Sequence, residues 1–269
     1  MAPATTTSEP GDPPGLAVQR FVGHLLSAIW VPATVALMRF GFGWRIDGAE
    51  NARRVYRHLQ RSRAPLLVCA NHLTLVDSAL VAWALGSPWW FLRHYAALPW
   101  NVPERQNFAS SMVSRVLVYL MKCVPVTRGG DRAEIGRVLG RLIHLLGRGE
   151  VVLLFPEGGR SRSGIVEAES AAYGVGRVIA ALPGCRVLCV YLRGERQERF
   201  SDLPERGDRF RVQVECLQPT SALKGMRRAR DLARQVTHTL TILEQRHFAG
   251  TPGDHAVGLF EQRHFDDRR

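Results

Sequence analysis

Short apolar runs alternate with helix-like segments along most of the chain, and this alternation limits the fold more than any other feature. Strand-like runs at 66–70 and 151–155 are each followed by a segment with helical spacing of apolar residues, and a further run lies at 187–192. Strands separated by helices pair in parallel, with the helices covering both faces of the sheet. We therefore expect an α/β fold with a largely parallel central sheet flanked by helices.

The remaining elements follow from the same periodicities. Further strands are expected at 44–47, 89–92, 123–127 and 210–216. Helices are expected at 49–61, 74–85, 108–121, 135–146, 170–182 and 226–247. With 269 residues, of which 46% are hydrophobic, the chain can bury a substantial core and fits one main domain, which we place at 43–247.

Both ends of the chain differ from this domain in composition. Residues 1–15 are rich in Pro, Thr, Ser and Gly and are expected to form a disordered leader. Residues 248–269 contain little periodicity, which predicts a mobile tail.

An apolar stretch at 21–38 follows the leader and is flanked by arginines. As a helix its eighteen residues would extend about 27 Å, slightly less than a bilayer core of roughly 30 Å, and Pro32 is expected to interrupt it. We expect 16–42 to be a membrane-associated helical segment, either interfacial or a re-entrant hairpin, with Trp30 and Trp44 as interfacial anchors. The alternative, a helix packed on the protein's own core, remains open.

The charge balance indicates an anionic partner. Thirty-six Lys and Arg against 24 Asp and Glu give a formal net charge of +12. Nucleic acid and an anionic membrane surface both fit such a charge. Because the chain contains no zinc-finger spacing, RNP-like aromatic motif or basic-region heptad, we expect membrane lipid and no nucleic acid.

The five cysteines lie mostly within apolar or strand-like runs. An odd number of such residues predicts reduced core thiols in a cytosolic compartment. Cys185 and Cys189 would lie more than about 12 Å apart on an extended strand, so we expect no metal site there. With the apolar stretch, these features predict a protein on the cytoplasmic face of the cell membrane.

His72 and Asp77 directly follow the buried strand expected at 66–70. Five residues apart in one helix, the two side chains would point about 140° away from each other. A capping box beginning at Thr74 would start the helix there and leave His72 in the preceding loop, where it can meet Asp77. Such a pair suits proton transfer. The alternative that Asp77 only caps a helix remains open.

A second group of polar residues follows the strand expected at 151–155. There Phe155 and Pro156 precede Glu157, two glycines and Arg160. Since parallel strands end at the same edge of a sheet, both groups are expected at one edge.

These residues, in this order, resemble the glycerophospholipid acyltransferase family, whose best-known members acylate lysophosphatidic acid. The resemblance runs from about Gly43 to Leu217 and includes the His-x4-Asp spacing, the run 124–128 and the Phe-Pro-Glu-Gly-x-Arg block at 155–160. It implies a 1-acylglycerol-3-phosphate O-acyltransferase-like enzyme of phospholipid biosynthesis. The donor would be an acyl-CoA or acyl carrier protein thioester, the acceptor a lysophospholipid, and no cofactor or metal would be needed.

The resemblance also implies roles for single residues. His72 would be the general base and Asp77 would hold its tautomer. The residues implied to form the acceptor pocket, with the arginines binding a phosphate, are Arg128, Glu157, Gly158 and Arg160.

Three departures from the family's pattern leave the acceptor open. Gly159 stands where Thr is usual, Val126-Thr127 where an aromatic or apolar pair is usual, and 190–192 lacks the usual proline. One alternative is therefore an acyltransferase of a specialised lipid or polyketide-like pathway. Another is a non-catalytic lipid-binding protein with the same fold.

Overall fold

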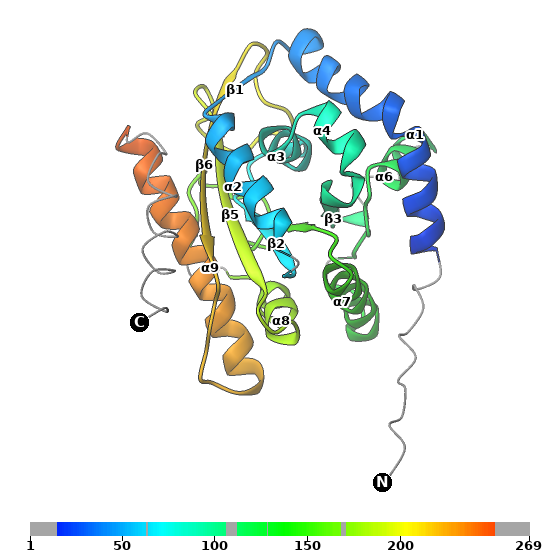
Figure 1. The fold of residues 1–269 in the computed structure, drawn as a ribbon. Helices are drawn as coiled ribbons and strands as arrows, with labels where there is room; N and C mark the ends of the chain where they lie inside the picture. Colours follow the sequence, from blue (N-terminus) through cyan, green and yellow to red (C-terminus); the bar gives the residue numbers. More distant parts are fainter. Residues whose placement is uncertain (1–14, 63, 106–111, 128, 168–170, 251–269) are drawn as a thin grey trace, which may run out of the picture.

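The computed structural model describes residues 15–62, 64–105, 112–127, 129–167 and 171–250. Within these ranges, six strands form one sheet in the order β1-β6-β5-β2-β4-β3 (Figure 1). The strands are β1 Arg45–Asp47, β2 Leu66–Ala70, β3 Trp100–Asn101, β4 Val152–Leu154, β5 Arg186–Gly194 and β6 Arg209–Leu217. All neighbours pair in parallel except β5 and β6, which are antiparallel. The expected α/β fold with a largely parallel sheet is confirmed.

Helices cover both faces of this sheet. They are α1 Leu16–Ala36, α2 Ala49–Arg61, α3 Asp77–Leu85, α4 Pro88–Arg93, α6 Met112–Leu120, α7 Arg132–Gly147, α8 Tyr173–Ala181 and α9 Gly225–Phe248. One core contains buried residues of α2, α3 and α4, and a second, on the other face, contains buried residues of α7, α8 and α9. Strand β2 contributes alternate residues to the two cores and is buried throughout. This explains its continuous apolar run.

Two expectations about local structure are wrong. The aromatic run 89–92, expected as a strand, lies in helix α4, because Pro88 occupies its first turn and the Ser87 hydroxyl accepts a hydrogen bond from Trp90 N at 3.3 Å. The run 123–127 makes only isolated bridges with the chain around β3, and Pro125 cannot donate to a ladder. The short strand β3 was not predicted.

Helix α1 differs from the expectation at Pro32. The helix runs through this proline to Ala36 and continues as a π-helix at Leu37–Gly41, so the expected interruption is wrong. Leu16–Gly41 contains an 18-residue window with a mean hydropathy of 1.7 and is the one helix in the described ranges long and apolar enough to cross a membrane. One face packs against α4 and α6. The outward face exposes large apolar side chains, among them Val18, Phe21, Leu25 and Ile29.

A buried group of charges joins the first turns of α1 to the domain. The Glu150 carboxylate forms ion pairs with Arg20 of α1 and with Lys122, whose Nζ lies 2.9 Å away. Trp100 Nε1 also donates to Glu150 at 2.5 Å. Lys122 is fully buried, and burial lowers its pKa to about 8 although Glu150 opposes the shift. Gln19 also donates to the backbone carbonyls of Tyr119, in the last turn of α6, and of Cys123, beyond the end of that helix. The start of α1 is therefore part of the folded domain.

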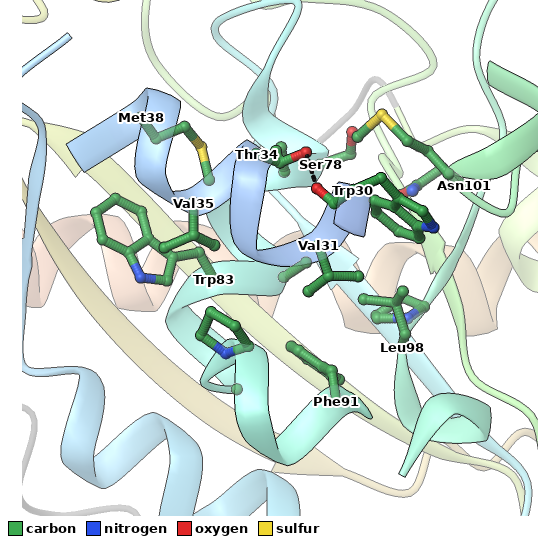
Figure 2. Close-up of a pocket in the computed structure, with 16 residues that line it drawn as sticks. Trp30, Val31, Thr34, Val35, Met38, Ser78, Trp83, Phe91, Leu98 and Asn101 are labelled. Atoms are coloured by element: carbon green, nitrogen blue, oxygen red, sulfur yellow. Dashed lines mark hydrogen bonds between the residues drawn. The ribbon is translucent and has the colours of Figure 1, made fainter. Parts of the chain in front are cut away.

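A small cavity of about 40 Å³ lies under the second half of α1 (Figure 2). Val31, Thr34 and Val35 of α1 line it on one side, and residues of α3 and α4 line it on the other. It shares four lining residues with a larger cavity described below, namely Ser78, Ala79, Asn101 and Met121.

Candidate active site

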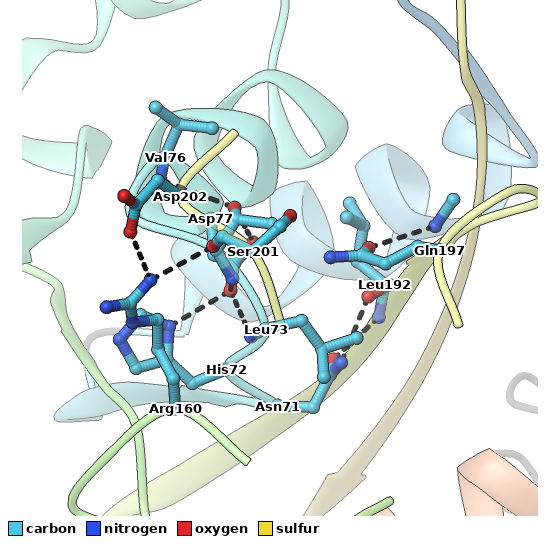
Figure 3. A network of polar contacts seen from close by, with 12 residues as sticks. Asn71, His72, Leu73, Val76, Asp77, Arg160, Leu192, Gln197, Ser201 and Asp202 are labelled. Carbon is cyan, nitrogen blue, oxygen red and sulfur yellow. Dashed lines mark hydrogen bonds and ion pairs between the residues drawn. The ribbon is translucent and has the colours of Figure 1, made fainter. Parts of the chain in front are cut away.

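His72 lies in the loop between β2 and α3, at the C-terminal end of a central strand. Its Nδ1 is 3.0 Å from Asp77 Oδ2, so the predicted meeting of the two side chains is observed (Figure 3). Helix α3 begins at Asp77, three residues later than predicted. The Thr74 hydroxyl bonds to the Asp77 carboxylate rather than capping the helix, and the turn at 74–76 brings Asp77 back towards His72.

The Asp77 carboxylate is buried and well supplied with donors. Besides His72, its Oδ2 accepts hydrogen bonds from Leu73 N at 2.5 Å and Thr74 N at 2.8 Å. Its Oδ1 accepts from Thr74 Oγ1 at 2.5 Å. Because the carboxylate is fixed by three groups of its own turn, it can fix the orientation of the imidazole, leaving Nε2 for chemistry.

Asn71, just before His72, fixes the end of β2 on β5. Its side-chain amide donates to Leu192 O at 3.0 Å and accepts from Leu192 N at 2.8 Å, as Figure 3 shows. Sequence reasoning assigned Asn71 no role. Its position next to His72 at a strand end was the available signal.

The imidazole of His72 stacks on the ring of Phe155, with centroids 4.0 Å apart and planes 15° from parallel. Both rings line a cavity of about 480 Å³, within the range of about 300–1,000 Å³ typical of small-molecule sites. Side chains from α3, α6 and α7 supply mostly apolar walls, among them Ala79, Leu117, Val118, Val138 and Leu142. The cavity is therefore suited to an alkyl chain whose end reaches His72.

Glu157 supports the His72 loop from behind. Burial raises the pKa of its carboxyl to about 7, although hydrogen bonds from the backbone of His72 and Glu167 oppose this. Its Oε1 is buried without a partner among the described residues, and Glu157 does not line the cavity. The structure thus places Glu157 beside the candidate base rather than on the cavity wall.

Arg160 lies close to the same loop, since Ser161 N donates to His72 O at 2.9 Å. Arg160 Nη1 donates to Asp202 Oδ1 at 2.7 Å and to Ser201 O at 3.0 Å (Figure 3). Its guanidinium also lies over the Phe200 ring, 5.5 Å from the centroid. No local pattern could have indicated these contacts, because Asp202 is 42 residues away.

The other two predicted pocket residues differ in their placement. Gly158 lines the cavity and has a φ of 69°, a conformation that favours glycine. Arg128 lies outside the described residues. Cys69, Cys123, Cys185 and Cys189 are buried free thiols, as expected for core positions, and Cys216 is half-buried.

Comparison with known protein families shows which family the chain belongs to. The family model described as Acyltransferase matches residues 44–193, more than half of the chain. The chain belongs to the acyltransferase family. The matched region begins just before β1 and ends within β5, so it includes the His72–Asp77 pair, Glu157 and Arg160. A search of curated proteins gave no match to this acyltransferase.

Proposed function

We propose that this acyltransferase is membrane-associated and moves an acyl chain from a thioester donor, acyl-CoA or acyl carrier protein, to a hydroxyl of a lysophospholipid such as 1-acylglycerol-3-phosphate. The observation that carries the proposal is the hydrogen-bonded His72–Asp77 pair at the wall of a 480 Å³ apolar cavity. A base beside an alkyl-sized cavity is what acylation of a hydroxyl requires.

In the proposed reaction, Nε2 of neutral His72 takes the proton of the acceptor hydroxyl as its oxygen attacks the thioester carbonyl. Asp77 stabilises the imidazolium that forms, because its carboxylate bonds to Nδ1. The carbon–sulfur bond then breaks, and the imidazolium returns the proton to the leaving thiolate. The products are an ester and a free thiol. The proposed reaction uses neither a cofactor nor a metal.

The cavity is assigned to the acyl chain of the donor, because its walls are mainly apolar. Arg160 is assigned to the phosphate of the acceptor. Arg160 precedes Ser161, whose backbone N donates to His72 O. A guanidinium can hold two phosphate oxygens at once. Arg128, Glu157 and Gly158 remain proposed members of the acceptor site, with Glu157 acting through the backbone of His72.

Membrane association is proposed through α1 and α6. The outward face of α1 and the exposed Met112 and Val116 of α6 are apolar, and these two helices pack against each other. Neither helix contains an acidic residue, and the chain as a whole carries a formal net charge of +12. This combination suits the anionic cytoplasmic face of a cell membrane and an interfacial position.

Purified protein incubated with radiolabelled acyl-CoA or acyl carrier protein and a panel of hydroxyl acceptors tests the reaction. Transfer to lysophospholipids, lost in His72→Ala, is the expected result. Transfer only to acceptors without a phosphate would favour a specialised pathway instead. Lipid binding without any transfer would favour a non-catalytic role.

Sedimentation with vesicles tests the membrane proposal. Full-length protein should sediment with anionic vesicles, and Phe21→Glu with Leu25→Glu should weaken this. Any electrostatic part of the binding should fall with salt. Protein that stays in the supernatant at low salt would contradict the proposal.

A further inference from the structure

The ion pair of Arg160 and Asp202 lies at the surface and involves one nitrogen of the guanidinium. Both hydrogen bonds of the guanidinium to described residues come from Nη1. A guanidinium has five donors, and Nε and Nη2 of Arg160 make no hydrogen bond to a described residue. The side chain of Arg160 is 25% exposed and that of Asp202 is 76% exposed. The carboxylate therefore sits on the accessible side of this cation.

Backbone hydrogen bonds hold the segment that carries Asp202. Ser201 N donates to Leu73 O at 3.0 Å, and Leu75 N donates to Asp202 O at 3.1 Å. Both bonds attach the segment to the turn that contains the candidate base. Because these attachments are made by the main chain, the Asp202 carboxylate can rotate into water without releasing the segment.

We propose that Asp202 is a resident counter-anion that occupies the position of the acceptor's phosphate on Arg160 and is displaced when the acceptor binds. This inference rests on the proposed function, since it assumes an anionic acceptor. A phosphate monoester carries more charge than one carboxylate and can engage two guanidinium nitrogens, so it displaces Asp202. An uncharged head group cannot. Asp202 is thus a specificity-determining residue that lowers the affinity for anionic acceptors and leaves the affinity for uncharged acceptors unchanged.

The variant Asp202→Asn tests this competition, because it keeps the shape of the side chain and removes its charge. Exposed ion pairs are weak, so we expect the acceptor KM for 1-acylglycerol-3-phosphate to fall about two- to fivefold. The donor KM and the KM for a monoacylglycerol acceptor should not change. Glu205→Gln is the matched control, since it removes one exposed charge from the same segment, and it should change none of these values.

A double-mutant cycle shows whether Asp202 acts through Arg160. In an Arg160→Gln background, Asp202→Asn should produce no further change of the acceptor KM. An unchanged acceptor KM in a single Asp202→Asn variant with normal thermal stability would overturn the inference. An equal fall of the KM values for 1-acylglycerol-3-phosphate and for monoacylglycerol would overturn it too.

Binding of glycerol 3-phosphate to the full-length protein, measured by calorimetry, separates this inference from the proposed function. Asp202→Asn should bind it about two- to fivefold more tightly than the wild type, whether or not acyl transfer is detected. Equal affinities would refute the counter-anion role. An absence of acyl transfer together with tighter binding would refute only the proposed reaction.

Discussion

Two hydrogen-bonded pairs, His72–Asp77 and Arg160–Asp202, lie near the ends of the neighbouring strands β2 and β4, and their surroundings are opposite in character. In the first, Asp77 is buried and accepts four hydrogen bonds, from His72, Leu73 and Thr74. In the second, Asp202 is 76% exposed and meets Arg160 through a single nitrogen. The first pair lies in the turn between β2 and α3, and main-chain hydrogen bonds attach the segments that carry the second pair to this turn.

The difference suits the two tasks proposed for these pairs, namely proton transfer and binding of the acceptor's phosphate. A general base must be held in one orientation before the substrate arrives, which a buried and fully bonded partner achieves. A group that binds a substrate charge must be able to exchange its partner, which an exposed pair permits. We therefore expect changes at the first pair to affect turnover and stability, and changes at the second to affect mainly the acceptor KM.

The largest effect is expected for His72→Ala. A positioned general base contributes about 10²–10⁴-fold, so kcat should fall by this factor. Steady-state kinetics measure the loss, and circular dichroism checks that the fold is intact. Normal turnover in a folded His72→Ala protein would rule out the proposed mechanism.

Thr74→Val should be the next most severe change. It removes the one hydrogen bond that Asp77 Oδ1 receives from the described residues, and the site is fully buried. Loss of a hydrogen bond to a charged group should lower the free energy of unfolding by about 1.5–3 kcal/mol, and kcat should fall as well. Urea denaturation measures the first effect. Thr74→Ser keeps the hydroxyl and should resemble the wild type, and equal stability of all three proteins would show that this bond is unimportant.

Glu157→Gln should change how stability depends on pH. Burial raises the pKa of Glu157 to about 7 in the folded protein, above the ordinary value of 4.5. A raised carboxyl pKa stabilises the fold fully below about pH 4.5, and this contribution is lost as pH rises through 7. Glu157→Gln should therefore be about 3 kcal/mol more stable than the wild type at pH 8, and the two should converge towards pH 5. Parallel stability curves would contradict the buried position of this carboxyl.

Arg160→Lys should have the smallest effect. The substitution keeps the charge but loses the two-nitrogen grip on phosphate, so the acceptor KM should rise about fivefold. The donor KM should not change. A raised donor KM with an unchanged acceptor KM would place Arg160 at the thioester donor instead, and would remove the contrast between the two pairs.

Much of the fold was predictable because its strongest elements have strong local patterns. Strand β2 and helices α2 and α7 lie where their periodicity placed them. The aromatic run 89–92 has the β propensity of a strand, but Ser87 and Pro88 before it start a helix. Helix α3 starts late because the Thr74 hydroxyl has a partner in Asp77 that competes with capping, which the sequence pattern does not reveal.

The site was predictable only where it is local. The five-residue spacing and helix geometry allowed His72 and Asp77 to meet, and the two side chains are in contact in the structure, although α3 begins at Asp77 rather than at Thr74. The contact between Arg160 and Asp202 depends on how the segment between β5 and β6 folds back onto the β2–α3 turn, which no periodicity encodes. Likewise, burial of Glu157 arises from its tertiary surroundings.

The ion pairs that Glu150 makes with Arg20 and Lys122 bear on how the proposed membrane binding of α1 should be removed by engineering. Cutting away the first helix would leave Glu150 and the fully buried Lys122 without the guanidinium that completes their cluster. Removing one member of a buried charge cluster commonly costs several kcal/mol. Substituting polar residues for the outward Phe21, Leu25 and Ile29 keeps the inward contacts of the helix. Substituting the outward residues of this helix should therefore be a better route to a soluble protein than deleting the helix.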